Sequence, residues 1–170
     1  TVPASAQDIV IGSKKFTESV ILGEIAGYLI RDKRIPAKHR RELGGTRVLW
    51  EALKKGDIDI YPEYTGTISQ ELLKGADTGN PTKMRAALAM DGIRMTAPLG
   101  FNNTYAIGVT KDTASRYGLK SISDLRRHAE LQLGFSNEFL DRGDGWPALR
   151  QKYNLPQRNV RGLDHDLAYR

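Results

Sequence analysis

The segment LKKGDIDIYPEYTGT, residues 53–67, contains the three kinds of element on which the expected fold depends. Thr46 begins a predicted helix and Gly56 ends it, because threonine is a frequent helix cap and glycine often follows a helix. Isoleucine alternates with Asp59 and Tyr61 over residues 58–61, which is typical of a short strand. Pro62 opens a polar, aromatic loop directly after it. The segment therefore predicts a helix, a strand and a loop at the strand's carboxyl end.

The same alternation precedes this segment. Residues 8–12 form a predicted strand, residues 17–31 a helix, and residues 40–43 a second strand. Apolar side chains recur in this helix at the spacing of one amphipathic face, namely Ile21, Ile25 and Leu29. This order is typical of a parallel sheet covered by helices, whose loops share one rim. The loops 13–16 and 62–67 are therefore expected side by side.

The pattern restarts after residue 100. Strands are predicted at 105–109, 131–135 and 159–163, with short helices at 113–117, 123–128 and 147–152. We therefore expect an α/β protein of two lobes, residues 1–100 and 101–170.

Composition and charge narrow the functional class. The chain has no cysteine, and its three histidines lack partners at metal-binding spacing, so neither disulfides nor a metal site is expected. The net charge of +6 is scattered. Its densest cluster, residues 31–42, is interpreted as a solvated helix end, with a phosphate-binding patch as the alternative. We expect no nucleic-acid partner. No motif combines a nucleophile, a base and an acid, which predicts a protein that is not an enzyme and uses no cofactor.

The sequence also bears on location. No apolar run approaches the length of a membrane span, so any association with a membrane is expected to be peripheral. The first seven residues are small and polar, which is typical of the end left by signal-peptide cleavage. An engineered chain end would have the same character.

Aromatic and charged side chains gather in the loops. Tyr64 follows the strand at 58–61, and Tyr105 opens the second lobe. Ring faces attract a cation that offers no hydrogen-bond donor. Lys14 and Arg142 would suit a carboxylate on the same small molecule. From the residues alone, packing for each tyrosine and solvation for each cation stay open as alternatives.

Six stretches of the sequence carry a more specific pattern, namely residues 12–18, 21–24, 44–46, 53–67, 101–106 and 139–146. In this order they resemble the osmoprotectant-binding proteins of glycine betaine/carnitine/choline ABC importers. The resemblance covers essentially the whole chain. It implies a fold like that of type II periplasmic binding proteins, in which two α/β lobes joined by a hinge close over a ligand.

The resemblance also implies roles for individual residues. Lys14 and Thr67 are expected to contact a ligand carboxylate from the first lobe, and Arg142 from the second. Tyr64 and Tyr105 are expected to form walls of an aromatic cage around a quaternary ammonium group. The implied partners are a membrane permease and its ATPase, and the implied location is the periplasm, with or without a lipid anchor.

The chain departs from the family in its length. Family members continue past the position equivalent to Arg170, so we expect the C-terminal part of the fold to be missing here. An open sheet edge would then favour pairing with a second copy of the chain. A self-assembling remnant of the fold that binds little or no ligand is the alternative to a transport protein.

Overall fold

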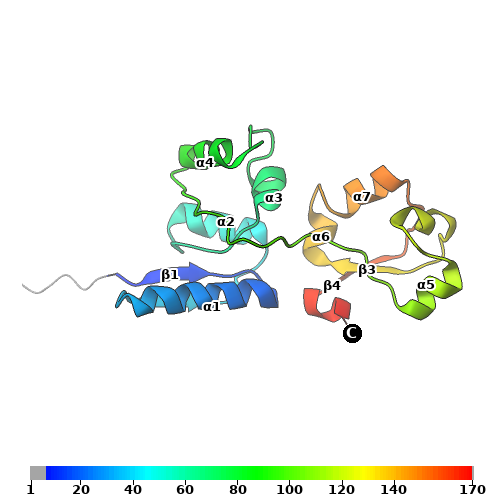
Figure 1. The fold of residues 1–170 in the computed structure, drawn as a ribbon, viewed down its shortest axis with the longest axis horizontal. Helices are drawn as coiled ribbons and strands as arrows, with labels where there is room; N and C mark the ends of the chain where they lie inside the picture. Colours follow the sequence, from blue (N-terminus) through cyan, green and yellow to red (C-terminus); the bar gives the residue numbers. More distant parts are fainter. Residues whose placement is uncertain (1–6, 170) are drawn as a thin grey trace, which may run out of the picture. The chain divides into compact units, whose positions relative to one another are not determined.

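The computed structural model describes residues 7–169 of the chain. It contains two compact units that divide between Ala97 and Pro98 (Figure 1). These units are defined by their internal packing. The sequence predicted two lobes, residues 1–100 and 101–170, that close over a ligand. This division into ligand-binding lobes stays a prediction.

The first unit is built on a short parallel strand pair. Its elements are β1 (Ile9–Gly12), α1 (Thr17–Asp32), β2 (Ala37–Arg40), α2 (Thr46–Lys55), α3 (Thr65–Thr67), a π-helical turn (Ile68–Leu72) and α4 (Pro81–Met90). β1 and β2 are parallel, in a register that places Ile11 opposite His39. The second strand therefore lies earlier than predicted, because the pairing with β1 ends at Arg40.

The predicted strand at 58–61 is reduced to a single bridge between Ile11 and Ile60. The reason is local. The carboxylate of Asp59 accepts the backbone N–H of Val10 at 2.7 Å, a donor that a longer strand would have bonded through a backbone carbonyl. The segment still runs beside β1, since the Gly12 N–H donates to the Ile60 carbonyl at 2.8 Å. Its carboxyl end therefore brings the loop after it close to the loop after β1.

Helix α1 packs through a different face from the one that the apolar spacing predicts. Ser19, Gly23 and Gly27 are its buried residues. The predicted core residues Ile21, Ile25 and Leu29 are instead 53%, 50% and 58% exposed. Close approach explains this, because a Cβ at Gly23 would lie 2.5 Å from the His39 Nε2 atom. Only a face of small residues can lie this near β2.

The core of the first unit lies between its helices. Trp50 from α2, Ile68, and Met84 and Leu88 from α4 form one buried cluster. Asn80 begins α4 by accepting the backbone N–H of Lys83 at 2.9 Å, a hydrogen bond typical of a helix cap.

The second unit has its own parallel strand pair. Its elements are α5 (Lys111–Tyr117), a 3₁₀ helix (Ile122–Arg127), β3 (Leu133–Ser136), α6 (Asn137–Asp141), α7 (Trp146–Tyr153), β4 (Val160–Leu163) and a final 3₁₀ helix (His165–Tyr169). β3 and β4 pair from Leu133 with Val160 to Ser136 with Leu163. The predicted strand at 105–109 is irregular, and no strand within residues 7–169 pairs with it.

A buried aromatic and aliphatic cluster forms the core of the second unit. Its buried members are Leu125, Phe139, Trp146 and Leu155. Gln157 is 1% exposed, and its side-chain amide donates to the carbonyls of Leu125 at 2.6 Å and His128 at 2.8 Å. The loop after α7 is thereby tied to the 3₁₀ helix of this unit. Among the helices of residues 7–169, none is both long and apolar enough to cross a membrane.

Candidate functional site

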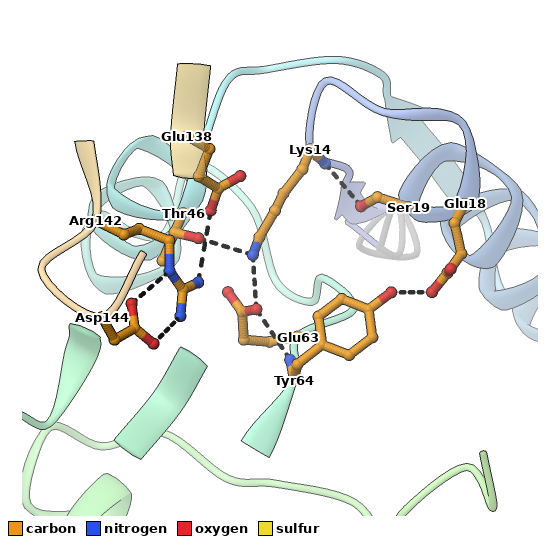
Figure 2. Close-up of polar contacts among 9 residues, drawn as sticks. All are labelled: Lys14, Glu18, Ser19, Thr46, Glu63, Tyr64, Glu138, Arg142 and Asp144. Carbon is orange, nitrogen blue, oxygen red and sulfur yellow. Dashed lines mark hydrogen bonds and ion pairs between the residues drawn. The ribbon is translucent and has the colours of Figure 1, made fainter. Parts of the chain in front are cut away.

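Lys14 lies in the loop between β1 and α1, and its side chain is only 3% exposed. Its ammonium donates to Glu63 Oε1 at 2.6 Å and to Thr46 Oγ1 at 2.8 Å (Figure 2). The backbone N–H of Lys14 donates to Ser19 Oγ at 2.9 Å, which ties the loop to the first turn of α1. A buried ammonium needs such partners, because an unpaired charge in this environment is costly.

Tyr64 lies beside Lys14 in the same unit. The centre of its ring is 5.9 Å from Lys14 Nζ, at the outer limit of a cation–π contact. The Tyr64 hydroxyl donates to Glu18, and its backbone N–H donates to Glu63 Oε1 at 2.9 Å. Thr67 is 6% exposed and ends the short helix α3 that follows Tyr64.

Glu63 is the group that joins these residues. Its side chain is 8% exposed, and one carboxylate oxygen accepts from both Lys14 and the Tyr64 backbone. Burial raises the pKa of the neighbouring Tyr61 phenol, and the negative charge of Glu63 raises it further. Tyr61 therefore stays a neutral hydrogen-bond donor at physiological pH.

Arg142 has an equivalent environment in the second unit. It lies just after α6, with its side chain 7% exposed. Its guanidinium makes two hydrogen bonds to Asp144, at 2.8 and 2.6 Å, and lies 3.9 Å from Glu138 Oε1 (Figure 2). Burial alone lowers the pKa of Arg142, but the hydrogen bonds to Asp144 outweigh burial and raise it. The group is therefore held as a cation.

Tyr105 contacts this guanidinium. Its ring centre is 5.9 Å from Arg142 Cζ and 4.8 Å from the ring centre of Phe139. Its side chain is 56% exposed. Beside it is an open groove of about 470 Å³, whose lining includes Thr104, Tyr105, Phe139, Asp144, Leu149 and Tyr153. A half-exposed ring over such a groove can present its face to a small molecule.

Each unit thus gathers a buried cation, a tyrosine ring and neighbouring carboxylates. The structure brings Lys14 to Tyr64 and Arg142 to Tyr105, as sets within single units. Sequence reasoning missed the carboxylates, Glu63 and Asp144. The position of Glu63, an acid between aromatic residues directly after a strand, is the sequence feature that could have indicated it. Among the described residues, no group of three or more metal-ligating side chains is present.

Parallel strand pairs covered by helices, with charged and aromatic side chains in the loops at the strand ends, are typical of the fold class of periplasmic binding proteins. Residues 7–169 match the OpuAC family, the substrate-binding domain of ABC-type glycine betaine transport systems. The chain belongs to this family.

Curated relatives carry several ligand names. The chain is 32% identical to the ergothioneine transport permease/ergothioneine binding protein EgtU of Helicobacter pylori, over 95% of this chain and 30% of that protein. It is 31% identical to the glycine betaine-binding protein YehZ of Escherichia coli, over 89% and 53%. It is 32% identical to the carnitine transport binding protein OpuCC of Listeria monocytogenes, over 98% and 57%. The chain therefore spans between 30% and 57% of the length of these relatives.

Solved structures show the same fold. The crystal structure of a glycine betaine/carnitine/choline ABC transporter superposes with a TM-score of 0.59 at 29% identity, over 95% of this chain and 63% of that one. Apo YehZ from Escherichia coli superposes with a TM-score of 0.54, also at 29% identity, over 94% and 61%. Both similarities confirm the predicted fold class.

Proposed function

We propose that this chain supplies ligand-binding elements of a solute-binding protein for an ABC importer, and that its ligand is a small quaternary ammonium compound such as glycine betaine, carnitine or choline. The observation that carries the proposal is the family match over residues 7–169. The membrane partners would be a permease and its ATPase, and the protein would act in the periplasm or outside the cell membrane.

The proposed recognition divides a zwitterionic ligand into two parts. A trimethylammonium group has no N–H donor, so it is bound best by electron-rich ring faces, here those of Tyr64 and Tyr105. A carboxylate is bound best by charged donors, here Lys14 and Arg142, with the hydroxyl of Thr67. If groups from both lobes bind one ligand, they stabilise the closed conformation, because only that conformation makes both sets of contacts.

The local geometry supports this division. Lys14 and Arg142 are both held as buried ion pairs, so each is oriented before a ligand arrives. A ligand carboxylate would share or replace the acceptors Glu63 and Asp144. A ligand that offered only a carboxylate would replace one ion pair of Lys14 or Arg142 by another, with little net gain. A ligand that also binds the tyrosine rings through its ammonium group is therefore favoured.

Isothermal titration calorimetry with glycine betaine, carnitine, choline and ergothioneine tests the proposal. Tyr64→Ala and Tyr105→Ala should each weaken binding of a quaternary ammonium ligand about tenfold, from the energy of one cation–π contact. Tyr28→Ala is the matched control, because Tyr28 is 68% exposed on α1. Arg142→Ala should weaken glycine betaine more than choline, which has no carboxylate.

Two results would contradict the proposal. If Arg142→Ala weakened the affinity for glycine betaine and for choline equally, Arg142 would not be the residue that binds the ligand carboxylate. No binding heat with any of the four ligands, together with a dimer mass in light scattering, would favour the self-assembling remnant of the fold instead.

A further inference from the structure

A second polar cluster lies in the first unit, outside the proposed ligand contacts. The His39 side chain is 4% exposed and is held at both ring nitrogens. Its Nδ1 lies 2.9 Å from Glu24 Oε1, and its Nε2 lies 2.9 Å from Ser13 Oγ. Glu24 on α1, His39 on β2 and Ser13 in the loop after β1 therefore form a continuous hydrogen-bonded network.

The direction of these hydrogen bonds depends on the charge of Glu24. A hydrogen bond from His39 lowers the pKa of Glu24, and a second from Arg41, whose Nε is 2.7 Å away, lowers it further. An ionised carboxylate only accepts, so His39 Nδ1 donates to Glu24, and in the neutral imidazole that carries its proton on Nδ1 the Nε2 atom is an acceptor. Ser13 then donates its hydroxyl proton to Nε2, while its oxygen accepts the backbone N–H of Glu42 at 3.3 Å. In that tautomer, each of the three side chains has a hydrogen-bond partner.

The same arrangement of groups serves nucleophilic catalysis in other proteins, but here the serine is inaccessible. Ser13 is 0% exposed, so no substrate can reach its hydroxyl. Ser13 is instead the residue before Lys14. Its backbone N–H donates to the Arg40 carbonyl at 3.1 Å, and its carbonyl accepts from Leu43 at 3.0 Å. The chain of hydrogen bonds therefore ends on the peptide that carries the Lys14 side chain.

We propose that His39 is a positioning residue that, through Ser13, fixes the loop of residues 13–16 and so holds the Lys14 ammonium at Glu63. Its effect on ligand affinity rests on the function proposed above. The role extends to α1, because the ring of His39 lies where a side chain at position 23 would be. Gly23 leaves the space that the ring occupies.

Amide hydrogen exchange of the 170-residue chain tests the positioning role without a ligand. The reporters are the N–H groups of Lys14 and Lys15, which donate to Ser19 Oγ at 2.9 Å and to the Gly44 carbonyl at 3.0 Å. His39→Asn keeps a donor near Nδ1 but does not reach Ser13, whereas His39→Gln places an amide near Nε2. Asparagine should speed exchange at both reporters about tenfold, the effect of losing one buried hydrogen bond. Glutamine should restore most of the protection.

Two glycine variants test the position of the His39 ring without changing His39 itself. Gly23→Ala should displace the imidazole and reproduce the exchange of His39→Asn. Gly27→Ala is its matched control, because this buried glycine lies one turn further along α1 and an added Cβ would meet only the flexible end of Arg31, at 3.0 Å. Gly27→Ala should leave the reporters unchanged. Unchanged reporters in both His39→Asn and Gly23→Ala would overturn the proposal, as would equal exchange in the asparagine and glutamine variants.

Ligand affinity separates this proposal from the proposed function. If both hold, His39→Asn should weaken glycine betaine several-fold more than choline, and should add no further loss in a Lys14→Met background. Altered exchange in a chain that binds no ligand would support the positioning role and contradict the proposed function. Normal glycine betaine affinity in His39→Asn, with unaltered exchange, would contradict the positioning role alone.

Discussion

At the scale of single residues, each unit holds a buried cation whose charge is balanced by a neighbouring carboxylate. Lys14 has Glu63 and Arg142 has Asp144. Sequence reasoning identified both cations through their family motifs but neither counter-ion. Motifs name the residues near a ligand, whereas the partner of a buried charge is set by which distant loop packs against it. Glu63 reaches Lys14 only because the segment before it runs beside β1.

The Lys14–Glu63 pair gives a residue-scale prediction. Glu63→Ala leaves a buried ammonium without its counter-charge and should lower the free energy of unfolding by about 3 kcal/mol. Glu51→Ala is the control. Its partner Lys54 lies 2.9 Å away on α2, but the side chains of Glu51 and Lys54 are 52% and 35% exposed, so the loss should be much smaller than that of Glu63→Ala. Urea unfolding measures both, and similar losses would contradict the importance of burial.

At the scale of elements, the order of helices and strands was largely predictable and the packing faces were not. Five predicted helices are present near their expected places, because end signals such as Thr46 and Gly56 are local. The prediction of a strand at 105–109 was wrong. Apolar residues that alternate along a segment do not show whether another strand lies beside it to pair with. The predicted buried face of α1 was also wrong. Periodicity locates the apolar residues, but it does not show that the face of small residues packs against the His39 ring.

The 3₁₀ helix at Ile122–Arg127 gives an element-scale prediction for pH. Hydrogen bonds from the Lys120 backbone, and then from the Ser121 side chain and backbone, lower the pKa of Asp124 from its ordinary value of 3.8. A lowered pKa in the folded state means stability that is complete above the unfolded-state pKa and is lost as the pH falls through the folded-state value.

Unfolding of the unmodified chain should therefore become easier as the pH falls below about 4, where aspartate ordinarily titrates. Asp124→Asn should be less stable at pH 7 and should converge on the unmodified chain in acid. Urea midpoints measured from pH 7 to strongly acidic pH check this. A gap between the two proteins that stays constant across that range would contradict the role of Asp124.

At the scale of the molecule, each unit has its own core and its own tryptophan. Trp50 belongs to the buried cluster of the first unit and Trp146 to that of the second. No residue is shared between these two clusters. The stability of each unit can therefore be followed separately by the fluorescence of the tryptophan that it contains.

Leu88→Ala gives the prediction at this scale. Leu88 is 2% exposed in the first core, so its truncation should cost about 2–5 kcal/mol in the transition reported by Trp50, measured in a Trp146→Phe background. Met90→Ala is the control on the same helix, because Met90 is 90% exposed. Its effect should be within about 0.5 kcal/mol. A loss as large in Met90→Ala as in Leu88→Ala would contradict the assigned core.

The sequence by itself determined the α/β class, the family and the loops that carry Lys14, Tyr64, Tyr105 and Arg142, because these depend on local patterns and on motifs that keep their order along the chain. Only the tertiary structure decided that Glu63 pairs with Lys14 and that His39 connects Glu24 to Ser13. Those contacts join groups from separate elements across a few ångströms. The contacts of His39 also depend on Gly23, whose missing side chain lets α1 and β2 approach closely enough for these buried polar groups to bond.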